Sequence, residues 1–184
     1  MELIPLGELI IRPLTKRIDP VFFNSHSDEL NEFLKKDAMR DQKNRVSRTY
    51  LCCWKTNIAG YVTLLTDTLE LHAVSEIDGI DGYFYQKYPA IKIARLAVDV
   101  KFERKGVGRF ILLTSIGKAI KISDEIGCRY ITVDSKPESI GFYEKHGFKV
   151  VKKYRNSNFP KMYLNIYPVV EMMQPKESLE EFEI

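Results

Sequence analysis

The most constraining feature of the sequence is a strand, a glycine turn, a helix and a second strand between residues 91 and 134. Residues 91–98 are an apolar run typical of a buried strand, and residues 106–126 carry apolar residues at helical spacing, with Gly127 as the expected stop. Residues 129–134 then predict another strand. This order predicts two parallel strands joined by a crossover helix, which indicates an α/β fold.

The segments before this unit predict antiparallel strands and one helix. Residues 8–14 contain Pro13 and suit an edge strand, and residues 48–54 and 58–65 predict a hairpin. Between them, capping side chains from Ser25 onward predict an amphipathic helix that reaches about Lys43. Residues 67–89 show a weak pattern with turn signals and are expected to form a loop.

The crossover helix and the segments after it complete the expected sheet. The helix is expected to pack through one apolar face, made of Val107, Phe110, Leu113, Ile116 and Ile120. Ser135 and Glu138 match a capping box that opens a short helix ended by Gly147. Residues 148–154 and 161–166 predict two closing strands, so the sheet is expected to be mixed and twisted, with six to seven strands flanked by helices.

Composition and charge bound the class of protein. The 184 residues fit one folded domain, expected over residues 1–168, followed by an acidic tail over residues 169–184. The net charge of +3 does not by itself indicate a nucleic-acid binder. Adjacent Cys52 and Cys53 would face opposite sides of a strand, which makes a poor disulfide pair and favours the cytoplasm. With no apolar run of membrane-spanning length, no membrane association is expected.

A basic, glycine-containing turn lies where the crossover helix must begin. Glycines at a helix start let backbone N–H groups turn toward a ligand, and the helix dipole favours negative charge there. The spacing matches neither a nucleotide-hydrolase loop nor a dinucleotide-binding fingerprint. A structural role for the glycines is the alternative to phosphate binding. The candidate phosphate-binding residues are Arg104, Lys105, Gly106, Val107, Gly108 and Arg109.

Two ordered motifs give the chain a family resemblance. The six residues from Glu103 to Gly108 resemble the Gln/Arg-x-x-Gly-x-Gly/Ala signature of the GCN5-related N-acetyltransferase (GNAT) superfamily, and Phe142, Tyr143, Gly147 and Phe148 match its Phe-Tyr-x-x-x-Gly-Phe block. Glu103 departs from the signature and places a like charge near the expected diphosphate. The resemblance covers most of the chain from residue 11 to about residue 166.

The resemblance implies a GNAT fold whose central parallel strands splay around acetyl-CoA, the cosubstrate. Leu96, Ala97 and Val98 would then run beside the pantetheine arm, with the Val98 N–H near the thioester carbonyl. Tyr143 matches the family's general acid, which protonates the departing thiolate, and its alternative role is core packing. No general base stands out. The three histidines have no cysteine or carboxylate at zinc-ligand spacing, so no metal is expected.

A narrower resemblance concerns the acceptor. Residues 94–99, together with Gly60 and Tyr61, are similar to acetyltransferase toxins of toxin–antitoxin pairs, which acetylate the α-amine of aminoacyl-tRNA. This resemblance implies tRNA and a ribbon-helix-helix antitoxin as partners. Arg95 is expected either to contact the substrate or to form a structural salt bridge. Two basic clusters are candidates for RNA contact: Lys35, Lys36, Arg40, Lys43, Arg45 and Arg48, and Lys149, Lys152, Lys153, Arg155 and Lys161.

Other acceptors and another class of function stay open at this point. A protein N-terminus, a lysine or a small amine would keep the chemistry and change the acceptor. A non-catalytic acyl-CoA-binding module is the alternative of another class, and Glu103 is the residue that favours it. Whether two copies form a homodimer is also open.

Overall fold

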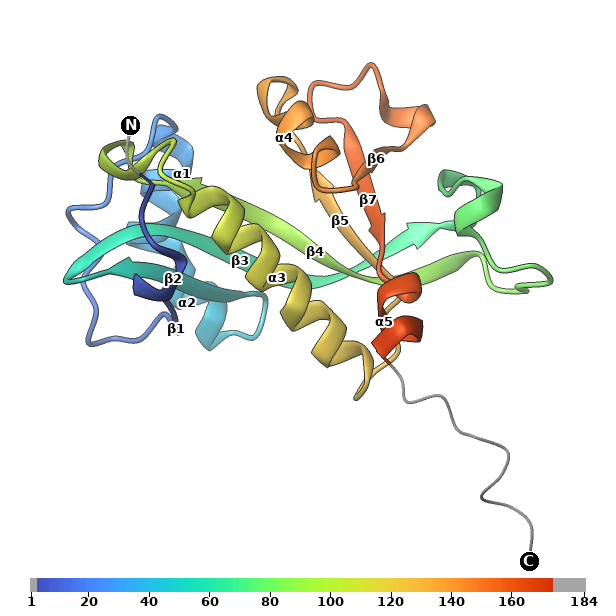
Figure 1. Ribbon diagram of the computed structural model, residues 1–184, viewed down its shortest axis with the longest axis horizontal. Helices are drawn as coiled ribbons and strands as arrows, with labels where there is room; N and C mark the ends of the chain where they lie inside the picture. The colour runs from blue at the N-terminus through green and yellow to red at the C-terminus, as the bar shows by residue number, and fades with distance from the viewer. Residues whose placement is uncertain (1–2, 174–184) are drawn as a thin grey trace, which may run out of the picture.

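The computed structural model describes residues 3–173, which form one twisted sheet with helices on both faces (Figure 1). In this part of the chain seven strands lie in the order β1-β2-β3-β4-β5-β7-β6, and β4 and β5 are its only parallel neighbours. The predicted mixed sheet is therefore confirmed. The strands are β1 (Leu9–Pro13), β2 (Arg48–Trp54), β3 (Asn57–Glu70), β4 (Lys87–Val98), β5 (Tyr130–Asp134), β6 (Lys149–Val150) and β7 (Lys161–Asn165).

The helices are short, apart from the crossover helix α3. The α-helices are α1 (Asp28–Glu32), α2 (Ala38–Lys43), α3 (Val107–Ser123), α4 (Ile140–Glu144) and α5 (Tyr167–Met173). A π-helical turn, η2 (Phe33–Asp37), joins α1 to α2, so the predicted helix ending near Lys43 is confirmed with one wide turn inside it. The 3₁₀ turns are η1 (Leu6–Glu8), η3 (Leu71–Ala73), η4 (Glu76–Asp78), η5 (Val100–Phe102), η6 (Pro137–Ser139) and η7 (Lys152–Tyr154).

The alternation of side chains along the strands divides the core into two layers. On β2, Leu51 is buried in the cluster under η2 and α2, whereas the next residue, Cys52, is buried in the cluster under α3. Cys53 again packs against the first layer, so the two adjacent cysteines face opposite sides as expected, and both are free thiols. Figure 1 shows α3 crossing one face of the sheet, with its N-terminus close to α1.

The contact between α3 and the sheet confirms most of the predicted apolar face, because Val107 is buried and Phe110, Ile116 and Ile120 pack against the same core cluster. The fully buried residues of α3 are Val107, Ile111, Leu112, Ser115 and Ala119, whereas Leu113 is 44% exposed. Small side chains at positions 115 and 119 let the helix lie close to the sheet. On the sheet side the close approach falls at Gly60, where a Cβ atom would stand 2.6 Å from Ile111 Cδ1 and 2.7 Å from the Ala97 carbonyl oxygen. The sequence pattern alone weighted the largest apolar residues, and it missed that small residues mark the line of contact.

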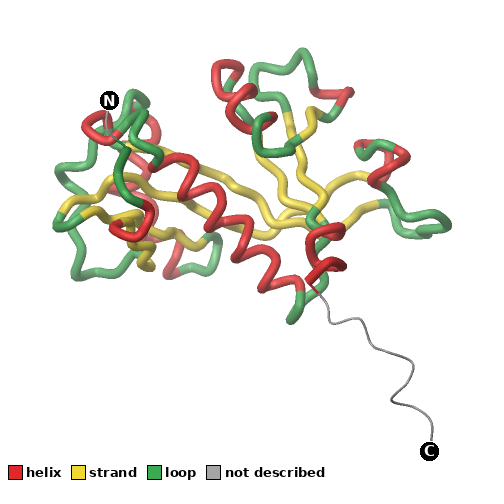
Figure 2. Tube along the Cα trace, viewed as in Figure 1, coloured by secondary structure: helices red, strands yellow, loops and turns green. Residues whose placement is uncertain are grey.

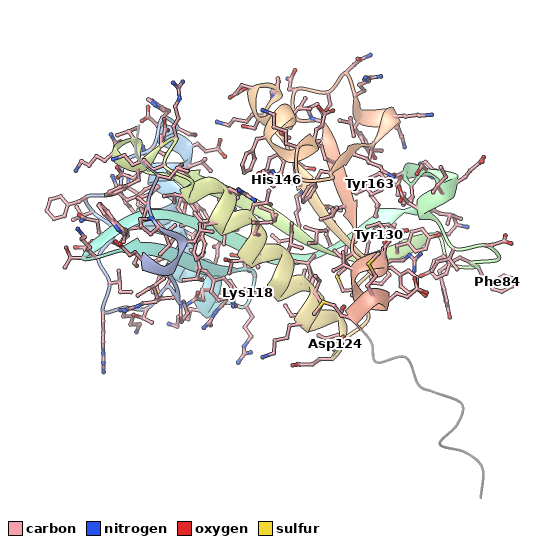
Figure 3. The ribbon with its side chains drawn as sticks, viewed as in Figure 1. Phe84, Lys118, Asp124, Tyr130, His146 and Tyr163 are labelled. Atoms are coloured by element: carbon pink, nitrogen blue, oxygen red, sulfur yellow. The ribbon has the colours of Figure 1, made fainter. Side chains whose placement is uncertain are left out.

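The segment between residues 67 and 89, expected to be a loop, is strand only at its two ends, because β3 runs on to Glu70 and β4 begins at Lys87. The residues between them form η3, η4 and irregular turns. The β3–β4 ladder continues to the pair Glu70 and Lys87, because Leu69 and Tyr88 are buried in a third apolar cluster beside Tyr130 and Tyr163. The rings of Tyr130 and Tyr163 lie edge to face with centroids 5.9 Å apart (Figure 3). Polar residues on the exposed side of this hairpin hid its two-residue alternation in the sequence.

Three predicted boundaries are also wrong. The helix α3 ends at Ser123, whose hydroxyl donates to the Ile120 carbonyl, and not at Gly127. The Ser135 hydroxyl donates to the Lys136 carbonyl and forms no capping box, so η6 begins at Pro137 instead. The strand expected over residues 148–154 keeps only two residues as β6, because η7 turns the chain away after Val151.

The end of the described chain lies near the proposed start of the tail. The helix α5 spans residue 168, the boundary that the sequence suggested between domain and tail. Most of the acidic tail lies outside the described residues. Within residues 3–173, no helix combines the length and the apolar character that crossing a membrane requires.

We expect Gly60→Ala to destabilise the fold by about 1–3 kcal/mol, because the new methyl group meets backbone as well as the Ile111 side chain. Urea unfolding followed by circular dichroism measures this. Gly117→Ala is the matched control: it lies in α3 with no atom within 4 Å of the added Cβ, and it should be neutral or stabilising by up to about 1 kcal/mol. Equal unfolding midpoints for both variants and the parent would contradict the close approach.

Candidate active site

The site is built where the two parallel strands part. Hydrogen-bonded pairing between β4 and β5 runs only from Ala90 and Tyr130 to Ile93 and Val133, after which β4 continues to Val98 paired with β3 alone. Figure 2 shows the strands diverging toward the α4 side of the sheet. The predicted divergence is confirmed. A cleft of about 770 Å³ lies in this fork, and its lining includes Glu29, Leu30, Arg95, Leu96, Ala97, Val98, Glu103, Lys136 and Tyr143.

The backbone of β4 turns hydrogen-bonding groups toward the fork. Val98 is opposite Gly60 on β3, and the Asp99 N–H donates to the Ala59 carbonyl at 3.0 Å. In an antiparallel ladder, this pattern means that Val98 and Gly60 are a non-hydrogen-bonded pair, whose backbone groups do not bond to each other. The N–H and C=O of Val98, and by alternation those of Leu96, therefore point away from β3 and toward the cleft. These are the groups that the sequence assigned to the pantetheine arm and the thioester carbonyl.

The glycine turn shapes the N-terminus of α3. Gly106 caps the helix with φ +88°, a left-handed conformation that suits glycine, and Arg104 adopts φ +56° two residues earlier. The first N–H groups of α3 have no partner within the helix and face outward from its end. A Cβ atom at Gly108 would lie 3.6 Å from Val98 and 3.9 Å from Phe142, so the bare glycine keeps the space between β4 and α4 open.

The other predicted phosphate-binding residues lie around this turn. Arg104 and Arg109 are exposed, and the Lys105 ammonium lies 5.7 Å from the centre of the Phe102 ring. Of the six-residue signature, only Glu103 lines the cleft itself. Val107 is buried in the core under α3, and the others lie at the turn beside the helix start. Open N–H groups, three mobile cations and uncovered glycine surface fit a diphosphate.

Tyr143 stands on the opposite wall of the cleft. It is 6% exposed, and its ring packs edge to face against Phe142 and Phe148, with centroids 5.2 Å and 5.4 Å away. Burial raises the pKa of its phenol to about 12, because the apolar surroundings disfavour the phenolate. In the described part of the chain the hydroxyl makes no hydrogen bond. The Tyr143 side chain therefore belongs to the core and also lines the cleft. Its hydroxyl stays protonated and is free to donate a hydrogen bond.

Arg95 lies on β4 and lines the cleft. Its guanidinium carbon is 3.6 Å from the centre of the Phe33 ring, and its buried Nε has no hydrogen-bond partner. Among the described residues no carboxylate lies within salt-bridge distance of Arg95. The alternative role, a structural salt bridge, is therefore wrong. Phe33 belongs to the π-helical turn η2, a local form that is frequent at functional sites.

Sequence reasoning missed two residues that organise the site. Asp99, buried at the end of β4, accepts hydrogen bonds from the Asn24 N–H at 2.9 Å and the Lys101 N–H at 3.0 Å. His26 pairs with Glu103 at 3.2 Å. A carboxylate directly after a buried strand was a usable signal for Asp99, which caps η5. Nothing in the sequence linked His26 to Glu103, which is 77 positions away.

The fold therefore has a cleft between two diverging parallel strands, with backbone groups of β4 on one side and the buried Tyr143 on the other, which is the architecture of an acyl-group transferase. Residues 18–162 match the family model described as the acetyltransferase (GNAT) domain, and the chain belongs to this family. It is an N-acetyltransferase, and acetyl-CoA is its acetyl donor.

Individual relatives agree with this family. A tRNA-acetylating toxin of Mycobacterium tuberculosis (strain ATCC 25618 / H37Rv) is 27% identical over 141 residues, which cover 76% of this chain and 83% of the relative. The structure of AtaT complexed with acetyl-methionyl-tRNAfMet has a TM-score of 0.80 at 22% identity, covering 90% of this chain and 99% of AtaT. AtaTR bound with AcCoA has a TM-score of 0.71 at 22% identity, covering 90% and 98% of the two chains. The structural matches establish the common fold.

We expect Gly108→Ala to weaken coenzyme A binding about tenfold without unfolding the protein. The added methyl group makes only ordinary contacts with Val98 and Phe142, but it stands between the helix start and the space for the diphosphate. Isothermal titration calorimetry with coenzyme A measures the affinity, and Gly117→Ala in the same helix is the control. Unchanged affinity in Gly108→Ala would place the diphosphate elsewhere.

Proposed function

We propose that this enzyme acetylates the α-amine of an aminoacyl-tRNA and acts as the toxin of a toxin–antitoxin pair. The observation that carries the proposal is the similarity to the tRNA-acetylating toxin, which extends over 83% of that relative. The catalytic domain comprises residues 1–168 and works in the cytoplasm, where charged tRNA is found. Its second partner is a ribbon-helix-helix antitoxin that covers the RNA-binding surface.

The exposed charge on the first helical segment supports an RNA ligand. In the first basic cluster Lys36 pairs with Glu32, and Arg40 pairs with Asp37. The remaining members are exposed and have no salt bridge among the described residues: Lys35, Lys43, Arg45 and Arg48. Uncompensated cations on one segment suit contact with several phosphates.

The second basic cluster is more strongly neutralised. Lys149 bonds to Asp78 at 2.6 Å, Lys161 to Asp67 at 3.0 Å, and Lys153 lies 3.7 Å from Glu70. These pairs connect β6, η7 and β7 to β3 and to η4, which lies between β3 and β4, so their first role is structural. We therefore place the main RNA contact on the first cluster, near α1 and α2.

The residues of the cleft account for direct transfer from thioester to amine. The amine nitrogen attacks the carbonyl carbon, the C–S bond breaks, and the sulfur takes the proton of the Tyr143 hydroxyl, while the amine loses its extra proton to water. The Val98 N–H faces the side where negative charge develops on the carbonyl oxygen. The α-amine of an ester-linked amino acid is less basic than a lysine, so it reaches the neutral form without a dedicated base.

Arg95 is the acceptor-binding residue in this scheme. A guanidinium that stacks on Phe33 and has an unpaired, buried Nε provides donors for a phosphate or ribose oxygen of the tRNA terminus. Lys92 lines the same half of the cleft, but it is paired with Asp134. Arg95 is therefore the cation in this half that is available to the acceptor.

The direct experiment incubates the purified enzyme with radiolabelled acetyl-CoA and charged total tRNA. We expect label on the aminoacyl group, and none on uncharged tRNA. Parallel reactions with peptides, lysine and polyamines test the other acceptors. Label on those amines alone would replace the tRNA acceptor, and binding of acetyl-CoA without any transfer would indicate a non-catalytic module.

We expect Tyr143→Phe to lower kcat by about 10²-fold or more, because the thiolate then leaves without a proton donor. Coenzyme A affinity by calorimetry should stay within about twofold, since a raised Tyr143 pKa means that the hydroxyl is uncharged in the parent as well. Tyr85→Phe, on the exposed hairpin segment, is the matched control. Equal rates for Tyr143→Phe and the parent would show that Tyr143 only packs in the core and does not act as the acid.

The pH dependence of the parent enzyme tests the same assignment. Burial raises the pKa of Tyr143 to about 12, so the acid stays protonated through neutral and moderately alkaline pH. We expect kcat to show no decline from loss of this proton up to about pH 10, the ordinary pKa of a tyrosine. A decline centred well below that value, absent in Tyr143→Phe, would show that the phenol is not held neutral.

A further inference from the structure

The carboxylate of Glu103 lies at a position where it should oppose the cosubstrate. It lines the cleft and comes three residues before Gly106, the cap of α3. A negative charge beside the helix start competes with a diphosphate for the same N–H groups and repels it. The structure shows how this chain compensates: His26 Nε2 lies 3.2 Å from Glu103 Oε2.

His26 is held in place by its neighbours. The Asn24 N–H donates to the buried carboxylate of Asp99, and the Asn24 carbonyl accepts from the Val100 N–H, both at 2.9 Å. On the other side of His26, the buried Asn31 side chain accepts from the Ser25 N–H at 2.7 Å and from its hydroxyl at 2.9 Å. Residues 24–27, here called the His26 segment, are thus fixed to the end of β4.

The same segment reaches the other side of the fork. The Lys136 ammonium, which follows β5 and lines the cleft, donates to the Ser27 hydroxyl at 3.2 Å. The His26 segment therefore contacts Glu103 on the α3 side and Lys136 on the α4 side. The imidazole is directed to Glu103 by this framework, although its side chain is 78% exposed.

We propose that His26 is a positioning residue that holds the Glu103 carboxylate through its Nε2, so that the N–H groups at the start of α3 stay available to the diphosphate of coenzyme A. The pair replaces the neutral or cationic side chain that the family signature has at position 103. Arg104, Lys105 and Arg109 supply the mobile countercharge around the same turn. The proposal rests on coenzyme A binding at this turn and is independent of the acceptor.

The test is a double-mutant cycle read by calorimetry with coenzyme A, which needs no turnover. His26→Ala should lower the affinity about fivefold, the upper range for an exposed pair, because it releases the Glu103 carboxylate beside the start of α3. Glu103→Gln should bind as well as the parent or slightly better. The double variant should return to the affinity of Glu103→Gln, and the deficit of His26→Ala should shrink in high salt.

The control is His72→Ala. His72 Nε2 lies 2.8 Å from Glu70 Oε2 in a similar exposed pair outside the cleft, so this variant should leave the affinity unchanged. If the double variant binds as weakly as His26→Ala, His26 acts by holding the segment and the charge proposal is wrong. Full affinity in His26→Ala also overturns it. If the parent itself gave no heat with coenzyme A, coenzyme A would not bind at this turn and the His26 proposal would fall. The proposed function would still be tested separately by the acceptor assays.

Discussion

The whole site depends on the end of hydrogen bonding between β4 and β5. Beyond Ile93 and Val133 the strands separate, and the backbone groups of Leu96 and Val98 lose a partner strand. Backbone N–H and C=O groups need a partner when water is excluded. In the proposed site, an extended ligand with its own amides, such as pantetheine, pairs with them in place of the missing strand. The helix α3 follows β4 and α4 follows β5. The same divergence therefore places the start of α3 and the Tyr143 helix α4 on opposite sides of the cleft.

Close packing then fixes where the donor is held. The small residues Gly60, Ser115 and Ala119 let α3 lie near the sheet, and this contact sets the position of its N-terminus relative to β4. Gly106 turns the chain into the helix with a positive φ, and Gly108 leaves the space beside Val98 free. Glycines that look alike in the sequence thus have three separate tasks: packing, turning and leaving room.

The charges of the cleft follow from burial. Tyr143 is surrounded by aromatic rings, so its phenol stays neutral and can donate a proton. Beside the start of α3, Glu103 lines the cleft and its carboxylate faces His26 at 3.2 Å. Arg95 gains contact from the Phe33 ring and keeps donors free. A neutral acid inside the cleft and a stacked cation with free donors suit an anionic donor and an acceptor that presents oxygen atoms beside a neutral amine.

The sequence by itself determined the α/β order, the glycine-led start of α3 and the Tyr143 block, because these depend on local backbone preferences and short spacings. It did not determine the length of the β3–β4 hairpin, where burial of Leu69 and Tyr88 outweighs the polar residues between them. It also could not link His26 to Glu103, since that contact exists only once β4 and the segment before α1 share the Asp99 carboxylate. Such contacts arise from strands far apart in the chain, and only the tertiary structure decides them.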